Sequence, residues 1–274
     1  MKEALKSQNL DSKENAGVNK ITNKSVLIFT LHRSASLLIH RICLSLRDEG
    51  GIPYYAPNLK NFPETEEVLS KEFWEGKSGC FGPIRWFVDV PNMDDYNVIL
   101  HLRDPRDVLV SMFYSYCYSH PGEVEGYTDY RKEVANEGVD SFVLYITSGE
   151  PAISRYGTGQ PALMGNVLER YENYTANLLG KPNVIFVKYE EMVTNFGSWL
   201  RKFLLPFDIA HKDLLASRIE KVGTKEFNVS EENVWEHKRR MTPGDYKEKL
   251  KPETIAELNK RFKDVLVKLD YSIL

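Results

Sequence analysis

Arginine and serine side chains follow the first apolar segment of the sequence. Residues 26–29 are all hydrophobic, and the next seven are mostly small or polar around one cation, Arg33, with Ser34 and Ser36 beside it. Apolar residues then recur at helical spacing, so the pattern predicts a buried strand, a tight loop and a helix that begins at Ser36. The first N–H groups of such a helix lack intrahelical partners, so this loop is suited to bind a phosphate-like anion. The same pattern is also typical of an ordinary strand-to-helix turn, and this segment alone leaves both interpretations open.

A second arginine stands at the end of another predicted strand. The apolar residues 98–102 lead directly into Arg103, and a helix is predicted to follow, with Asp104 as its N-cap and Pro105 in its first turn. Ser111 lies eight residues after Arg103, about two helical turns further along, so both side chains can face the same side.

Two more groups complete the set. An arginine pair, 239–240, lies in an irregular basic stretch near the C-terminus, and Tyr189 ends a third apolar strand, 184–189. Parallel α/β sheets bind ligands beyond the carboxyl ends of their strands, which places Arg33, Arg103 and Tyr189 on one rim. Two cationic strand ends and a basic closing segment suit a ligand with two separate anionic groups.

The elements that position these residues alternate between strand and helix along the chain. This alternation predicts an α/β fold with a three-layer arrangement, in which a mostly parallel central sheet carries helices on both faces. Residues 57–97 are expected to be a long irregular connection, and residues 118–162 to form short helices and a surface loop. Pro252 is expected to begin a final helix that runs to about Leu269.

Composition bounds the class of protein. The 274 residues are 42% hydrophobic and 27% charged, which is typical of a globular protein. A net charge of −3 gives no reason to expect nucleic acid or a membrane as partner, so any anion site must be local. Three well-separated cysteines, Cys43, Cys80 and Cys117, indicate reduced core residues and a cytoplasmic location. Residues 1–23 are polar and predict a flexible arm, followed by a single domain over residues 24–274.

Four stretches, in the same order, resemble signatures of the sulfotransferases that use 3′-phosphoadenosine 5′-phosphosulfate (PAPS). Residues 31–37 stand where that family has Tyr-Pro-Lys/Arg-Ser-Gly-Thr-Thr between a strand and a helix. Residues 102–111 match its Arg-Asn/Asp-Pro-Arg-Asp motif, including a serine eight residues after the first arginine. Residues 239–247 follow the spacing of Arg-Lys-Gly-x-x-Gly-Asp-Trp-Lys, and residues 189–192 look like Tyr-Glu-Asp-Met.

The resemblance implies a P-loop-like sulfotransferase fold with PAPS as co-substrate. It implies that the Arg33 loop holds the 5′-phosphosulfate, that Arg103 and Ser111 hold the 3′-phosphate, and that residues 239–247 close over it. The residues expected to bind PAPS are Arg33, Ser34, Ala35, Ser36, Leu37, Arg103, Ser111, Tyr189, Thr224, Arg239 and Arg240.

Several positions depart from the family pattern. Ala35 replaces a glycine and Leu37 a threonine of the first motif, Met241 replaces a glycine of the last, and Leu38 stands where cytosolic members stack a tryptophan on adenine. The histidine that many members carry before the second motif has no counterpart, because residues 41–100 contain no histidine.

The expected activity is transfer of a sulfuryl group to a hydroxyl or amine of a small-molecule acceptor, without a metal. Arg33 would hold the leaving phosphate, and an acceptor proton would go to a general base, for which His120, His32 and a carboxylate within residues 72–95 are the alternatives. A homodimer is left open, since Lys247–Glu253 matches the family's dimer motif only loosely.

Two other classes compete with this interpretation. A P-loop kinase or NTPase would need Gly-x-x-x-x-Gly-Lys-Ser/Thr in the first loop, and this loop has neither glycine nor that lysine. A non-catalytic nucleotide-binding protein that kept the fold is the second alternative, and the retained Arg33, Arg103 and Ser111 argue against it.

Overall fold

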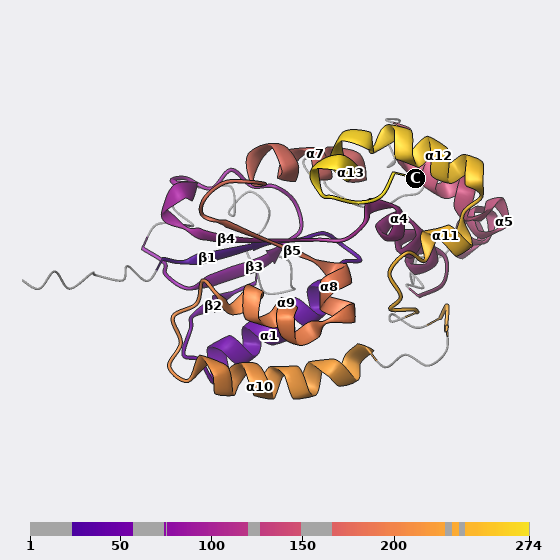
Figure 1. The fold of residues 1–274 in the computed structure, drawn as a ribbon. Coiled ribbons are helices and arrows are strands. Elements are labelled where there is room, and N and C mark those ends of the chain that lie inside the picture. The colour runs from indigo at the N-terminus through magenta and orange to yellow at the C-terminus, as the bar shows by residue number, and fades with distance from the viewer. Residues whose placement is uncertain are drawn as a thin grey trace, which may run out of the picture.

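The centre of the protein is a sheet of parallel strands. The computed structural model describes residues 24–56, 74, 76–119, 127–148, 166–227, 232–235 and 239–273. Within these residues the strand order is β2-β3-β1-β4-β5, and every pairing is parallel (Figure 1). The strands are β1 (Val26–Phe29), β2 (Tyr54–Tyr55), β3 (Cys80–Ile84), β4 (Asn97–Leu102) and β5 (Val184–Lys188). The carboxyl ends of β1 and β4 therefore lie side by side, just before Arg33 and Arg103.

The uninterrupted apolar run of β1 is explained by burial on both of its faces. Leu27 and Phe29 belong to one hydrophobic cluster, whereas Val26 and Ile28 belong to a second cluster on the other side of the sheet. Successive strand side chains point to opposite faces, so a strand without polar residues needs a helix layer on each side.

Helices cover both faces of the sheet, which confirms the predicted three-layer α/β fold (Figure 1). One face is covered by α1 (Ser36–Asp48), α8 (Tyr189–Thr194), α9 (Phe196–Leu204) and α10 (Lys212–Gly223). The other face carries α4 (Pro105–Tyr114), α5 (Tyr127–Ile146), α7 (Val167–Asn177), α11 (Tyr246–Lys249), α12 (Pro252–Arg261) and α13 (Lys263–Lys268). Single turns of other helix types are η1 (Met93–Asp95), η2 (Ser115–Ser119) and η4 (Thr224–Phe227).

The start of α4 is set by its first residues, as predicted. Asp104 caps the helix by accepting the backbone N–H of Arg106 at 2.9 Å, and Pro105 occupies the first helical position. Pro lacks the N–H that would be unsatisfied there, so the chain turns sharply from β4 into α4 immediately after Arg103.

The prediction that residues 57–97 are irregular was wrong for β3. Gly82 and Pro83 interrupt the apolar pattern of this segment, yet β3 is fully buried between β2 and β1. Gly82 has φ +143°, and a Cβ at this position would lie 2.7 Å from the carbonyl oxygen of Ile28. The glycine is therefore required by close approach to β1 and does not mark the end of a strand.

The residues of α5 form two helical segments that meet at Gly138, whose φ of 86° is not helical, so this stretch contains the short helices that were expected. One other helix differs from expectation. The final helix is divided in two at Phe262, whose ring is buried in the core below α7. The aromatic residues Trp74, Phe81 and Trp86 lie in the core cluster and cover the sheet, while Phe73 lies outside the described residues.

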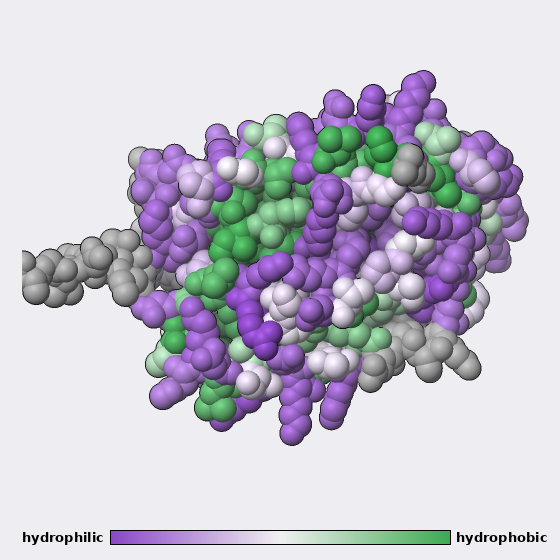
Figure 2. Space-filling model, viewed as in Figure 1, coloured by the Kyte–Doolittle hydropathy of each residue, from purple (hydrophilic) through white to green (hydrophobic). Residues whose placement is uncertain are grey.

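Most of the surface in the view of Figure 1 is hydrophilic. Hydrophobic residues gather over the sheet near β5 (Figure 2), an edge strand whose Val184, Ile185 and Phe186 are only half-buried. Among the described residues, no helix has the length and apolar character needed to cross a membrane.

Candidate functional site

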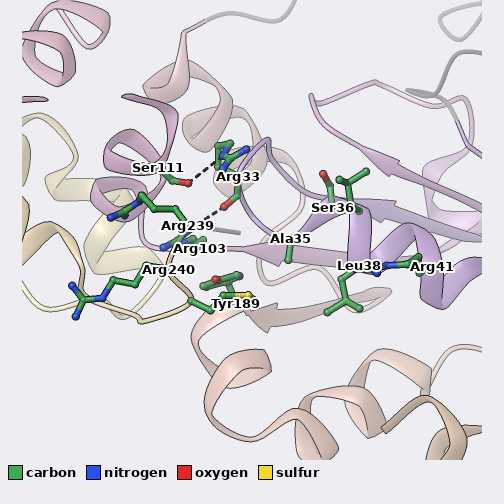
Figure 3. A pocket seen from close by; sticks show the side chains of 12 residues that line it. Arg33, Ala35, Ser36, Leu38, Arg41, Arg103, Ser111, Tyr189, Arg239 and Arg240 are labelled. Carbon is green, nitrogen blue, oxygen red and sulfur yellow. Dashed lines mark hydrogen bonds between the residues drawn. The ribbon is translucent and has the colours of Figure 1, made fainter. Parts of the chain in front are cut away.

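A pocket lies at the carboxyl edge of the sheet, between the loop after β1, the end of β4 and the segment that begins at Arg239. Figure 3 shows the side chains of the β4–α4 region and of the arginine pair on one side, with those of α1 on the other. Five of the twelve lining residues are arginines and none of the twelve is acidic. They are Arg33, Ala35, Ser36, Leu37, Leu38, Arg41, Arg103, Ser111, Tyr189, Arg239, Arg240 and Met241.

The loop between β1 and α1 has an unusual backbone for its sequence. Arg33 and Ala35 both adopt left-handed conformations, with φ 66° and φ 58°. The carbonyl oxygen of Ala35 accepts the N–H groups of Leu38 and Ile39, at 2.9 and 3.1 Å, so the first turn of α1 begins from this residue. Two left-handed residues in so short a loop bend the chain around the positive end of a 13-residue helix.

The Arg33 side chain lies between the two motifs. Its Nε donates to Ser111 Oγ at 3.1 Å, and its carbonyl oxygen accepts from the guanidinium of Arg103 at 3.1 Å (Figure 3). Burial, reinforced by the positive charges of Arg103 and Arg239, lowers the pKa of Arg33 to about 10. Arg33 is thus held close to two further cations, and an anion bound here would relieve the repulsion between them.

Arg103 is buried and held on several sides. Its guanidinium lies 4.3 Å from the ring centre of Tyr189 and 3.7 Å from the carboxylate of Asp107, while Tyr171 donates its hydroxyl to the Arg103 carbonyl at 2.5 Å. Burial works against the charge, but the partners that surround it, Tyr189 and Asp107 first, keep the pKa above its usual value. Its Nε is buried and has no hydrogen-bond partner within the described part of the chain, which leaves one donor for a ligand.

The arginine pair is fixed by acidic residues of its own segment. Arg239 forms ion pairs with Asp245 and Glu232, and its guanidinium lies 4.1 Å from the ring centre of Tyr114 on α4. Arg240 pairs with Glu248 at 2.5 Å. These contacts hold the two side chains at the rim of the pocket, next to Arg103.

The structure brings most of the sequence-predicted residues to this pocket. Ser34 lies directly beneath it, fully buried, and its hydroxyl has no hydrogen-bond partner among the residues that the structure describes. His32 is half-buried in the same loop but does not belong to the pocket lining. Thr224 is exposed on η4 and donates to the carbonyl of Glu220, away from the lining, and His120 lies outside the described residues.

Three lining residues, Leu38, Arg41 and Met241, were not among those expected to bind PAPS, and Arg41 was missed by the sequence analysis altogether. It is four residues after Leu37 and three after Leu38, and such spacing places side chains on one face of a helix. Helical periodicity could therefore have identified it once α1 was predicted. In the described part of the chain, no group of three or more His, Cys, Asp or Glu residues could hold a metal ion.

Comparisons with known proteins agree with this architecture. The model of the sulfotransferase domain family matches residues 92–270, which is more than half of the chain. A crystal structure of mouse sulfotransferase SULT7A1 complexed with PAP is 16% identical, with a TM-score of 0.61 over 90% of this chain and 85% of that one. Retinol dehydratase in complex with retinol and PAP is 14% identical, with a TM-score of 0.50 over 88% and 81% of the two chains.

At such low identity the two solved structures establish similarity of fold. No curated protein sequence matches the chain significantly. The matched family range includes Arg103, Ser111 and Arg239, three of the residues that meet in the pocket. The chain therefore belongs to the sulfotransferase domain family.

Proposed function

We propose that this protein transfers the sulfuryl group of PAPS to a hydroxyl or amine of a small-molecule acceptor and releases adenosine 3′,5′-bisphosphate (PAP). The observation that carries the proposal is the convergence of Arg33, Arg103 and Arg239 from three separate parts of the chain on one pocket, whose described lining residues include no acidic one. The family assignment supports sulfuryl transfer, and the PAP-bound neighbours share the fold.

The residues present fit a ligand with two anionic groups. One cluster is the left-handed loop with the N-terminal N–H groups of α1, and the second consists of Arg103, Ser111 and Arg239. Both clusters contain a buried polar atom for which the described residues supply no partner: Ser34 Oγ beneath the loop and Arg103 Nε in the second cluster. Unsatisfied buried polar atoms are rare in proteins, so their presence here supports a ligand that completes them.

Each cluster has a distinct task in this proposal. When bound, PAPS supplies a sulfuryl group on a phosphate that becomes the leaving group. Arg33 and the N–H groups at the start of α1 bind this phosphate and stabilise the charge that grows on it. Arg103, Ser111 and Arg239 bind the 3′-phosphate and fix the orientation of the nucleotide, while Tyr189 and Leu38 contribute apolar surface beside the base.

The general base and the acceptor are proposed from the sequence and from the comparisons. His32 and His120 remain the candidate general bases, and a small-molecule acceptor is in keeping with the neighbour that binds retinol. A cytoplasmic location, a single domain over residues 24–274 and a homodimer remain predictions from the sequence. Of the two rival classes, the kinase is excluded by the family assignment. A non-catalytic nucleotide-binding protein is the alternative that the experiments below must distinguish from an enzyme.

Calorimetric titration with PAP, compared with ATP and magnesium, tests the proposal. We expect the wild-type protein to bind PAP more tightly than ATP. The variants Arg33→Gln and Arg239→Gln should each weaken PAP binding at least about tenfold, since each removes a charge-assisted contact. Arg47→Gln is the matched control, because Arg47 lies on the exposed part of α1 and pairs with Asp48.

Turnover is then measured with radiolabelled PAPS and a panel of phenols, alcohols and amines. Label transfer that disappears in Arg33→Ala would support the catalytic role of Arg33. PAP binding without transfer to any acceptor would favour the non-catalytic alternative, and a preference for ATP would refute the proposal.

A further inference from the structure

A histidine lies directly beneath the loop between β1 and α1, which carries Arg33. His101 is on β4, two residues before Arg103, and is fully buried. Its Nε2 lies 3.1 Å from the carbonyl oxygen of Ser34, and its Nδ1 accepts a hydrogen bond from Trp199 Nε1 at 3.3 Å. The sequence analysis did not assign it a role in the site.

The tautomer of this histidine is fixed by its neighbours. An indole N–H can only donate, so Nδ1 must be the unprotonated nitrogen of the His101 ring. Nε2 then carries the proton and donates it to the Ser34 carbonyl. Burial lowers the pKa of His101 to about 3, so the ring stays neutral at physiological pH and keeps this single tautomer.

This hydrogen bond determines which way the loop presents its backbone. In a trans peptide the carbonyl oxygen and the next N–H point in opposite directions. Because His101 holds the Ser34 carbonyl inward, the N–H of Ala35 must point outward, away from the core. Ala35 lines the pocket, and its N–H has no partner among the described residues.

The peptide would not hold this orientation by itself. Ala35, one of the two residues that this peptide joins, is in a left-handed conformation that ordinary residues rarely adopt, and so is Arg33, the residue before Ser34. With Ala in place of the glycine expected from the family pattern, the hydrogen bond between His101 and the Ser34 carbonyl opposes a flip of this peptide. Trp199 on α9 packs edge-to-face against the His101 ring, with ring centres 5.4 Å apart, and keeps the imidazole in place.

We infer that His101 is a positioning residue that aims the Ala35 N–H at the 5′-phosphate of the bound nucleotide, with Trp199 holding its tautomer. The inference rests on the proposed function. It extends the anion site beyond the pocket lining, through β4 to α9, so that a residue with no access to the ligand sets the geometry of the loop that binds it.

A pair of nucleotides tests this role. PAP carries a 5′-phosphate, whereas adenosine 3′-monophosphate lacks it but keeps the 3′-phosphate for Arg103 and Ser111. We expect His101→Leu to weaken PAP binding by roughly 10- to 100-fold, the effect of losing one hydrogen bond to a charged group, and to leave binding of adenosine 3′-monophosphate within about twofold. General damage to the fold would weaken both ligands alike.

Further variants separate the hydrogen bond from packing. His101→Gln keeps an N–H donor for Ser34 and an acceptor for Trp199, so it should restore most of the PAP affinity. Trp199→Phe removes the N–H that fixes the tautomer of His101 and should reproduce part of the loss of PAP affinity. If His101→Leu does not fold, this variant tests the role of His101 in its place. Val187→Ala, at the residue paired with His101 on β5, is a core substitution that should change neither affinity.

The ring itself can be observed in the wild-type protein by ¹⁵N resonance. A neutral, Nε2-protonated His101 that does not titrate between about pH 5 and 8 is expected. A His101→Leu variant that binds PAP normally, or that loses both nucleotides equally, would overturn the inference, as would a titrating His101. Wild-type protein that binds neither nucleotide would instead overturn the proposed function, and the inference with it.

Discussion

The carboxylate of Asp107 accepts a hydrogen bond from the backbone N–H of Gly244, at 2.8 Å. It also accepts the N–H of Tyr246 at 3.0 Å and lies 3.7 Å from the guanidinium of Arg103. One buried side chain in the first turn of α4 therefore fixes both a pocket arginine and the segment that carries Arg239. Since the two sequence motifs meet at this carboxylate, we expect them to act as one unit.

Replacement of Asp107 with Asn tests this coupling. The change removes the negative partner of a buried arginine and places an amide group against two N–H donors, so the free energy of unfolding should fall by about 3–5 kcal/mol. PAP affinity should fall as well, because the segment 239–247 is released. Urea unfolding and calorimetry measure the two effects, with Asp48→Asn on the exposed end of α1 as control. Unchanged stability would refute the assigned role.

Glu190 should contribute to the pH dependence of the free energy of unfolding. This carboxylate accepts the Asp104 N–H at 2.9 Å and the Tyr271 hydroxyl at 2.8 Å, but burial outweighs these bonds and raises its pKa above the ordinary 4.5. The folded state then binds the proton more tightly than the unfolded state. Its contribution to stability must fall as pH rises from 4.5 through the folded pKa, and stay constant above it.

Glu190→Gln should flatten that decline. The amide oxygen can accept one of the two hydrogen bonds without carrying a charge, so the difference in stability between the variant and the wild type should change with pH in that window. Denaturant unfolding at a series of pH values measures it. Glu191→Gln is the neighbouring control, since Glu191 is partly exposed and paired with Lys202. Parallel curves for Glu190→Gln and wild type would contradict the assignment.

Ala35 is expected to limit stability at the loop. A left-handed conformation costs a non-glycine residue about 1–2 kcal/mol, and glycine avoids this cost while losing about 0.5–1 kcal/mol more backbone entropy on folding. Ala35→Gly should therefore be stabilising by up to about 1 kcal/mol. Ala216→Gly, inside α10, should be destabilising by a similar amount. Thermal unfolding of the two variants provides the comparison, and equal signs would refute this explanation.

Tyrosine hydroxyls from α7 hold the carboxyl ends of the two central strands. Tyr171 donates to the Arg103 carbonyl, and Tyr174 donates to the Thr30 carbonyl at 2.7 Å. Each Tyr→Phe change leaves a buried carbonyl without that donor and should cost about 1–3 kcal/mol of stability. Tyr171→Phe should also weaken PAP binding, because Arg103 loses its support, whereas Tyr55→Phe on β2, where the ring stacks on Phe81, should do neither. Equilibrium unfolding and calorimetry distinguish these outcomes.

The strands and loops that carry the site could be predicted because their residues obey local rules. β1 is an uninterrupted apolar run, β4 is apolar apart from Asn97 and His101, and Asp104 with Pro105 starts α4 as capping chemistry requires. β3 could not be predicted, because Gly82 is set by its approach to Ile28, a contact between residues far apart in the sequence. The same limit applies to His101, whose polar partners, Ser34 and Trp199, lie on two other elements.

The position of β1 at the centre of the sheet has a consequence for synthesis of the protein. Its neighbours β3 and β4 both come later in the chain, so the apolar strand leaves the ribosome long before either can pair with it. Some seventy residues separate the ends of β1 and β4, an interval of roughly 4–15 s at ordinary translation rates. Until β4 is made, one edge of this apolar strand has no partner, so production at low temperature with added chaperone should raise the yield of native protein.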